Sequence, residues 1–369
     1  MQVIHFCSCD LFIPIRNLNI NSLLNLANHD LYRKQYTYEE LRRTTLFDRW
    51  KETFSSFDFL IDRGYDNWLI TFSGGKDSTT VLILALEYIK KNPGRVKRVD
   101  VVYSDTLVEI PTIHIFAKSI ITFLKSYKRQ NKINLFTHIT KPELKNRFWV
   151  KILGYGYPPP HQMFRWCTDK LKIKPAEKSL SNYIKKNRTA ILTGVRFGES
   201  NSRDLRLNTS CSRGGECGQG LWFKESAKLS AGYLAPIINW QSCEVWDFLS
   251  GFAPDLGYPV KQIEAVYNGH ETRFGCWMCT VIKTDKAMLK TIENEEWKHL
   301  KPLADFRNFL WDYTRNPNTR IRRKDGNVGK LRLNVRKYLL KKLIEVSQNS
   351  GVILIENQEL KFINQIWKK

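Results

Sequence analysis

The chain has 369 residues, of which 42% are hydrophobic and 26% charged, and this balance excludes wholesale disorder and collagen-like architecture. Lys and Arg outnumber Asp and Glu by 59 to 36, and the net charge of +23 indicates a polyanionic partner, nucleic acid before an anionic membrane surface. No apolar run approaches the ~20 residues of a membrane span and no secretory signal pattern opens the chain, so we expect a cytoplasmic protein without a membrane partner.

The first 45 residues give a weak, mixed signal that predicts an extension with short helices. Apolar strand patterns and helical patterns then alternate as far as residue 195. This alternation predicts an α/β fold, an open and mostly parallel sheet with helices on both faces. The expected strands are 67–72, 96–103, 133–139 and 189–195, and the expected helices are 78–90, 111–127 and 170–186.

The region after residue 197 changes character. Residues 198–232 are rich in Gly, Ser, Arg and Cys without a clear period, which indicates a long functional loop, and 233–238 reads as a fifth strand. From residue 242 onward the pattern is mainly helical, with long amphipathic helices at 297–315 and 331–346. The expected domains are an N-terminal extension (1–60), a nucleotide-binding α/β domain (61–240) and a helical C-terminal region (241–369).

The strongest local signal is the run Ser-Gly-Gly-Lys-Asp-Ser-Thr at residues 73–79, between an expected strand and an expected helix. Glycines let backbone N–H groups close on an anion, and the helix N-terminus adds its dipole. Asp77 would repel a phosphate unless it caps the helix or holds a divalent cation. The common mononucleotide loop does not fit, because Asp77 follows the lysine. An ordinary capped turn is the alternative.

Residues 73–78 resemble the SGGxDS signature of the PP-loop ATP pyrophosphatases, whose fold is of the adenine nucleotide alpha hydrolase type. The resemblance implies that ATP binds here with Mg²⁺ and is cleaved between its α and β phosphates. It implies catalytic roles for Lys76, Asp77 and Arg196. The nucleotide would be bound by Ser73, Gly74, Gly75, Asp77 and Ser78.

Three further segments resemble the PAPS-reductase-like branch of that superfamily. They are the run from Asp105 and Thr106 to Pro111, the motif Arg-Trp-Cys-Thr-Asp-Lys at 165–170, and the motif at 194–200 with Arg203. The resemblance implies that they contribute to the nucleotide site through Asp105, Thr106, Lys170, Arg196, Glu199 and Arg203. A helix cap at Asp105 and a structural ion pair between Arg196 and Glu199 are the alternatives.

Cys276 and Cys279 form a C-x-x-C pair, which by itself fits zinc, a redox dithiol or two buried thiols. The surrounding run 273–282 closely resembles the DNA phosphorothioation proteins DndC and relatives such as SspD. With Cys167, the resemblance implies a [4Fe–4S] cluster. We place the fourth ligand at Cys217, ahead of Cys211 and His270, because residues 268–272 lack the cysteine those relatives carry.

These features together predict ATP-dependent sulfur insertion into nucleic acid. A phosphate oxygen of the DNA backbone would be adenylylated, and sulfur would then displace AMP. A cysteine desulfurase would supply the sulfur, and other phosphorothioation subunits would be partners. The alternatives are a PAPS or APS reductase, a tRNA thiolase and a non-catalytic nucleic-acid-binding subunit. The basic run 320–324 is expected to be exposed, either solvated or in contact with phosphate.

Overall fold

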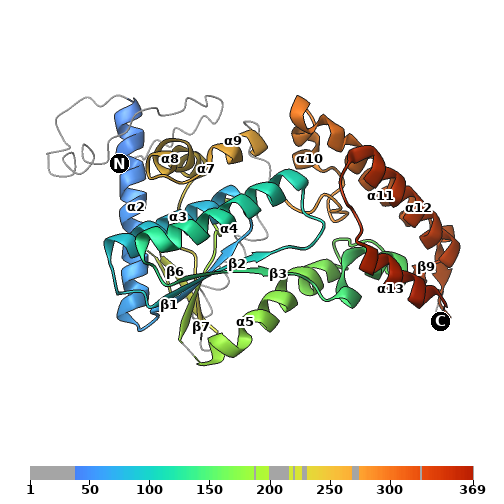
Figure 1. Ribbon diagram of the computed structural model, residues 1–369, viewed down its shortest axis with the longest axis horizontal. Coiled ribbons are helices and arrows are strands. Elements are labelled where there is room, and N and C mark those ends of the chain that lie inside the picture. Colours follow the sequence, from blue (N-terminus) through green and yellow to red (C-terminus); the bar gives the residue numbers. More distant parts are fainter. Residues whose placement is uncertain are drawn as a thin grey trace. The chain divides into compact units, whose positions relative to one another are not determined.

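The structure is a computed structural model, and it describes residues 38–186, 188–198, 216–218, 221–226, 231–267, 274–324 and 326–368 (Figure 1). The described residues form two compact units. Unit 1 takes in the described parts of 1–103, 116–138 and 181–265, and unit 2 those of 104–115, 139–180 and 266–369.

Unit 1 is built on a sheet whose central strands are buried almost throughout, as expected for strands covered on both faces. In the described residues the strand order is β3-β2-β1-β4-β7-β6-β5, and β1 pairs in parallel with β2 and β4, as β4 does with β7. The β5-β6-β7 edge is antiparallel. The strands are β1 (Asn67–Phe72), β2 (Arg98–Ser104), β3 (Leu135–Thr140), β4 (Thr189–Leu192), β5 (Glu216–Gly218), β6 (Leu221–Glu225) and β7 (Ala231–Leu234).

The helices of unit 1 include the long first helix α2, whose side chains Phe57 and Leu60 are fully buried. The Thr53 hydroxyl of the same helix donates to the carbonyl of Pro236 at 2.9 Å. The helices are α2 (Tyr38–Asp62), α3 (Lys76–Lys91), α4 (Pro111–Asn131), α7 (Ser242–Asp247), η4 (Phe248–Phe252), α8 (Ala253–Asp255) and α9 (Lys261–Tyr267).

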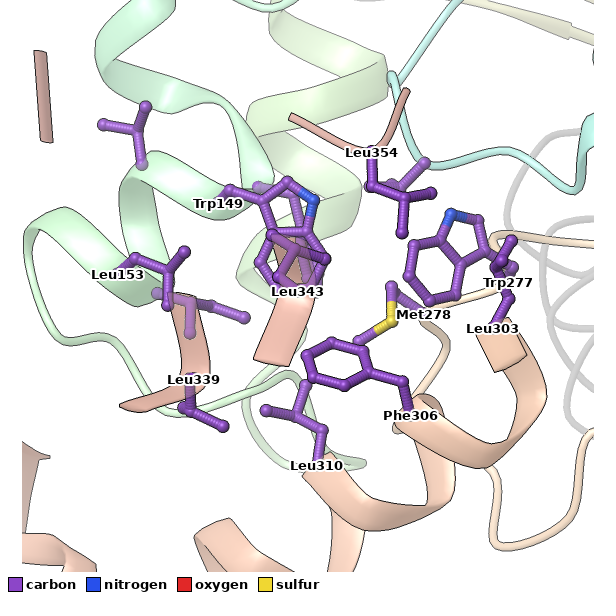
Figure 2. Packing of buried hydrophobic residues seen from close by; sticks show 14 of the residues in the cluster. Trp149, Leu153, Trp277, Met278, Leu303, Phe306, Leu310, Leu339, Leu343 and Leu354 are labelled. Atoms are coloured by element: carbon purple, nitrogen blue, oxygen red, sulfur yellow. The ribbon is translucent and has the colours of Figure 1, made fainter. Parts of the chain in front are cut away.

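Unit 2 is mainly helical and encloses an apolar core of its own (Figure 2). Helix α11 packs against α12, and both α12 and α13 pack against the short helix η2. Trp149, Leu310, Leu339 and Leu343 fill the centre. Its elements are η1 (Leu144–Asn146), η2 (Val150–Gly154), η3 (Thr168–Ile173), α5 (Lys174–Lys186), α10 (Lys286–Thr291), η5 (Glu295–Leu300), α11 (Lys301–Arg315), η6 (Pro317–Thr319), β8 (Arg320–Arg322), β9 (Val328–Leu331), α12 (Leu333–Ser350) and α13 (Asn357–Lys368).

The predicted α/β class and the helical C-terminal region are confirmed. The boundaries expected at residues 60 and 240 do not coincide with the two units, because the chain passes between the units inside β2, α4, β3, α5 and α9 rather than in linkers. The fifth strand lies earlier than predicted, at 231–234. Pro236 has no N–H to donate to a sheet, and a turn closed by the Ile238 N–H and the Ala235 carbonyl follows.

Among the residues that the structure describes, no helix combines the length and the apolar character that crossing a membrane requires.

Candidate functional site

The loop after β1 is folded by its own hydroxyl groups. Gly74 has φ = 77°, a left-handed conformation that favours glycine. The Ser78 hydroxyl donates to the Gly75 carbonyl at 3.0 Å and accepts the Ser73 N–H at 3.2 Å. The two serine hydroxyls are 3.0 Å apart. The sequence Ser-Gly-Gly-Lys-Asp-Ser therefore specifies a closed turn that leads directly into α3.

Helix α3 begins without a side-chain cap among the described residues, because its N-cap is Gly75. Its first-turn N–H groups and its dipole thus favour an anion at this end. Asp77 does not cap the helix. One of its oxygens accepts hydrogen bonds from Lys76 Nζ at 3.1 Å and from Arg196 Nε at 2.6 Å. The predicted capping role is therefore not seen, the carboxylate is shared by two cations, and a divalent cation at Asp77 stays a prediction.

Arg196 reaches this loop from the segment that follows β4. Since β4 runs parallel to β1, the carboxyl ends of both strands meet at one edge of the sheet, where open α/β sheets bind ligands. The Arg196 side chain is only 6% exposed, and its second contact is with the carbonyl of Trp240 at 3.0 Å. Glu199 and Arg203, its predicted neighbours, lie outside the described residues. Lys76 and Arg196 thus place two cations on the Asp77 carboxylate beside the helix N-terminus.

Gly194 opens the motif at 194–200 that the sequence analysis placed at the nucleotide site, but the sequence assigned this glycine no role of its own. A Cβ atom at this position would lie 2.8 Å from the Ser78 nitrogen and 2.9 Å from the Asp77 carbonyl carbon. Both atoms belong to the backbone of the loop, so neither can move aside cheaply. The signal available in the sequence was a glycine two residues before Arg196.

The Cys276–Cys279 loop of unit 2 is anchored by the two residues between its cysteines. Trp277 and Met278 are 2% and 1% exposed, and both insert into the apolar core beside Phe306 (Figure 2). The Cys279 N–H donates to the Cys276 carbonyl at 2.9 Å, which closes the turn. The apolar pair therefore fixes the loop in the core and sets the position of both thiols.

The segment after β2 packs on this loop. The Trp277 N–H donates to the Val108 carbonyl at 3.0 Å, and Glu109 forms a β-bridge with Cys276. The Thr106 hydroxyl lies 3.7 Å from the Cys276 sulfur and donates to the Glu109 carboxylate at 2.8 Å. Thr106 thus contacts a thiol, and its place beside the nucleotide stays a prediction.

Asp105 shapes the turn that makes these contacts. Its carboxylate accepts the N–H of Leu107 at 3.0 Å, and Leu107 has φ = 65°, an unfavourable conformation for a branched residue. Lys141 Nζ and His114 Nδ1 lie 3.7 and 3.9 Å from the same carboxylate, which is 2% exposed. Asp105 is therefore a buried anion that holds a strained turn against the thiol loop.

Cys167 joins the two other thiols from a distant part of the chain. Trp166 positions it by stacking on Phe148 and by donating its Nε1–H to the Pro158 carbonyl at 3.1 Å. Burial raises the pKa of the Cys167 thiol, and Cys279 adds to the rise. Burial, followed by the Glu109 carboxylate, raises the pKa of Cys276 to about 12. Cys167 and Cys276 each interact electrostatically with Cys279, and burial favours the neutral thiol form of both.

The thiols only partly fit the predicted cluster. In the part of the chain that the structure describes, no three Cys, His, Asp or Glu side chains are grouped closely enough to hold a metal ion. Cys217 lies on β5, where its backbone pairs with Trp222, but its side chain is outside the described set. Cys211 and His270 are outside it as well. The iron–sulfur cluster stays a prediction.

Lys170, predicted to bind phosphate, lies half-buried in η3, and burial, followed by the charge of Lys170, lowers the pKa of Lys151. Two neighbouring cations of this kind would favour an anion.

Arg307 on α11 holds the thiol loop from the other side, and nothing in the sequence pattern indicated it. The side chain is 1% exposed. It donates to the Cys279 carbonyl from Nε at 3.1 Å and from Nη2 at 2.7 Å. It also donates to the carbonyls of Ile282 and Lys283. One buried guanidinium thus fixes the backbone that follows Cys279.

Comparison with known proteins gives one family match. Residues 67–282, more than half of the chain, match the family model of the phosphoadenosine phosphosulfate reductase domain. An uncharacterized protein of Methanocaldococcus jannaschii is 26% identical over 221 residues, which is 58% of this chain and 36% of the relative, so the chain spans about a third of that relative's length.

Two solved structures are similar at low identity. A PAPS reductase from Candida auris, in a phosphate complex, shares 17% identity at a TM-score of 0.38 and covers 66% of this chain and 97% of its own. An NH₃-dependent NAD synthetase from Campylobacter jejuni shares 16% identity at a TM-score of 0.32 and covers 72% of this chain and 95% of its own.

Proposed function

Because the chain belongs to the phosphoadenosine phosphosulfate reductase domain family, an enzyme family of the PP-loop fold, we propose that it is an ATP pyrophosphatase that inserts sulfur into nucleic acid, with the DNA backbone as substrate. The resemblance of residues 273–282 to DNA phosphorothioation proteins supports the choice of DNA. The net charge of +23 supports it too, because Lys and Arg neutralise backbone phosphates.

The observation that carries the proposal is the charge arrangement at the start of α3. Lys76 and Arg196 are both buried and both paired to Asp77, so two cations are fixed beside an uncapped helix N-terminus. Such a group suits the pyrophosphate that leaves when ATP breaks next to AMP. Mg²⁺, when bound to the phosphates, would neutralise further charge there. Asp77 then acts by orienting Lys76 and Arg196.

The reaction has two displacements at phosphorus. A non-bridging oxygen of a DNA phosphate attacks the α-phosphorus of ATP, and pyrophosphate leaves with the electron pair of the broken P–O bond. The DNA phosphorus now carries AMP, a far better leaving group than oxide. A sulfur nucleophile attacks this phosphorus and AMP departs. The phosphodiester has exchanged one oxygen for one sulfur.

The sulfur donor sets a second requirement. If a persulfide R–S–S⁻ attacks phosphorus, the product carries a P–S–S–R linkage. A second thiolate must then attack the sulfur bonded to R, so that the S–S bond breaks, the phosphorothioate leaves with its electron pair and a disulfide forms with R. Cys167, Cys276 and Cys279 provide neighbouring thiols for such an exchange. A cysteine desulfurase would charge one of them.

The test follows the fate of ATP labelled in the α-phosphate. Purified protein is incubated with labelled ATP and Mg²⁺, and separately with a DNA duplex, a tRNA or neither. We expect AMP and pyrophosphate, with DNA as the stimulating substrate, and sulfur-containing dinucleotides in the nuclease digest when a desulfurase and cysteine are added. ADP as the product, or no cleavage with any substrate, would overturn the proposal. Stimulation by tRNA alone would transfer it to tRNA.

PAPS reduction is the second candidate, and the family match favours it directly. In that reaction the nucleotide is the substrate and a thiol reductant converts its sulfuryl group to sulfite. The resemblance implies a nucleophilic cysteine near the C-terminus, yet none of the 90 residues after Cys279 is a cysteine. Sulfite release from PAPS, with no ATP consumed, would favour this candidate over sulfur insertion.

A further inference from the structure

The hairpin β8–β9 and the first turn of α12 carry an unusual density of positive charge. Residues 320–337 contain eight Lys and Arg side chains and one acid, Asp325, which lies outside the described residues. The basic residues are Arg320, Arg322, Arg323, Lys324, Lys330, Arg332, Arg336 and Lys337. An antiparallel ribbon thus presents cations at close intervals.

The ribbon is firmly attached to unit 2. Leu331 is fully buried in the core, and its N–H donates to the Gly156 carbonyl at 2.8 Å. The turn is closed by the Arg323 N–H and the Asn327 carbonyl at 2.8 Å. Arg320 Nε donates to the Gly329 carbonyl at 2.8 Å, across the two strands. The exposed cations therefore stand on a fixed backbone, which reduces the entropy lost on binding.

The cations at the tip have no acidic partner in the part of the chain that the structure describes. Arg322, Arg323, Lys324 and Lys330 are exposed, and among the described residues none of them has a carboxylate within ion-pair distance. The neighbouring helices differ: on α11 Lys301 pairs with Asp305, and on α12 Lys342 pairs with Glu345. Burial and the charge of Arg323 lower the pKa of Arg320, so the like charges already repel one another. Such a cluster favours an external polyanion.

We propose that the β8–β9 hairpin binds the phosphate backbone of double-stranded DNA. The choice of DNA rests on the proposed function. A two-stranded ribbon has the width that a DNA groove admits, and unpaired Arg and Lys side chains suit the phosphates on either side of it. The contact is sequence-independent, because it engages phosphates and not bases.

The test compares two variants that remove the same charge. One is Arg322→Gln, Arg323→Gln, Lys324→Gln in the hairpin. The control is Lys118→Gln, Lys125→Gln, Arg129→Gln on α4, whose side chains are also exposed and, among the described residues, without an ion-pair partner. The dissociation constant for a labelled duplex is measured at several NaCl concentrations, after thermal melting has shown that both variants fold like the parent.

Each phosphate contact contributes about 0.9 to the slope of log affinity against log salt, so the hairpin variant should lose about three units of slope and bind about 10- to 100-fold more weakly at moderate salt. The control should keep the slope of the parent. If both variants weaken DNA binding equally, the overall positive charge of the protein, and not the hairpin, attracts the DNA, and the proposal is overturned. The proposal would also be overturned if the hairpin variant lost binding to anionic lipid vesicles but kept the DNA affinity of the parent.

ATP cleavage separates this inference from the proposed function. The hairpin variant should need more DNA for half-maximal pyrophosphate release but reach the same maximal rate, since the loop at α3 is intact. If the parent never forms AMP and pyrophosphate but the hairpin variant still loses DNA affinity, the proposed function fails and the DNA contact stands.

Discussion

The two candidate sites differ in how the chain assembles them. The loop at the start of α3 is formed by consecutive residues and closed by hydroxyl groups two to five residues apart. The thiol site draws on four segments, represented by Thr106, Cys167, Cys276 and Arg307. A contiguous loop can be recognised from its letters, whereas a site of distant segments depends on the packing that brings them together.

The two sites also treat charge in opposite ways. At the loop, the Asp77 carboxylate pairs with two cations, Lys76 and Arg196. At the thiols, the Glu109 carboxylate faces Cys276 and raises its pKa beyond the effect of burial. The first site is ready for an anion. The second disfavours its own thiolates until a positive partner, such as a metal ion, arrives.

The largest effect is expected at the loop. Lys76→Ala removes a fixed cation next to the leaving pyrophosphate, so we expect the rate of pyrophosphate release to fall by about 10²- to 10³-fold. Lys90→Ala, at the other end of α3, is the matched control, because Lys90 pairs with Glu87 and is 41% exposed. Its rate should stay near that of the parent. Equal losses in both variants would mean that the helix, and not the loop, governs activity.

The next effect concerns the packing that holds the thiol loop. Arg307→Gln leaves the carbonyls of Cys279, Ile282 and Lys283 without their donor, and we expect the free energy of unfolding to fall by about 3 kcal/mol. Urea unfolding measures it. Alkylation of Cys279 should also become faster, because its backbone is released.

Arg315→Gln on the same helix is the control for Arg307. Arg315 is exposed and lies over the Trp311 ring, 3.6 Å from its centroid. Its replacement should change the unfolding free energy by less than about 1 kcal/mol. Similar losses for both arginines would contradict the role assigned to the buried one.

A smaller effect is expected from changing the glycines at the two sites, where the backbone is packed with different closeness. Gly194→Ala forces a methyl group against the backbone of Asp77 and Ser78, and we expect a loss of about 2 kcal/mol in stability and about tenfold in pyrophosphate release. Gly275→Ala is the counterpart beside the thiols. Its φ is not positive and its Cβ would meet no described atom within 4 Å. It should therefore be tolerated. If both variants lose the same stability and activity, the inference that the backbone is packed more tightly at Gly194 than at Gly275 is wrong.

Much of unit 1 could be predicted from the sequence. Strand β1 has the predicted bounds, and the PAPS-reductase-like branch, inferred from the runs at 105–111, 165–170 and 194–200, is confirmed. Apolar strands and a glycine loop leave local patterns. The role of Arg307 could not be predicted, because the residue type alone does not show whether an arginine is buried or exposed. Nor could the contact of Thr106 with Cys276, since 170 residues separate them and only packing decides their distance.

The smallest effect concerns the charge beside the thiol. Glu109→Gln removes the carboxylate that opposes ionisation of Cys276, and it leaves Lys172, which lies 3.4 Å from that carboxylate and favours the thiolate. The pKa of Cys276 should therefore fall. At fixed pH the thiolate fraction and the alkylation rate should rise by about three- to tenfold. The rate is read by mass spectrometry of the Cys276 peptide in chelator-treated protein.

Glu143→Gln provides the matched control, because Glu143 is an exposed carboxylate of the same unit that pairs with Lys178 and Lys145. It should leave the Cys276 rate unchanged. If Glu109→Gln has no effect either, burial alone sets the pKa of Cys276. The proposed contrast between the two sites, cations at the loop and a carboxylate facing the thiol, is then wrong. A faster reaction only in the Glu109 variant would show that the chain places a carboxylate against its own thiol, so that binding a positive partner must supply the free energy that ionisation requires.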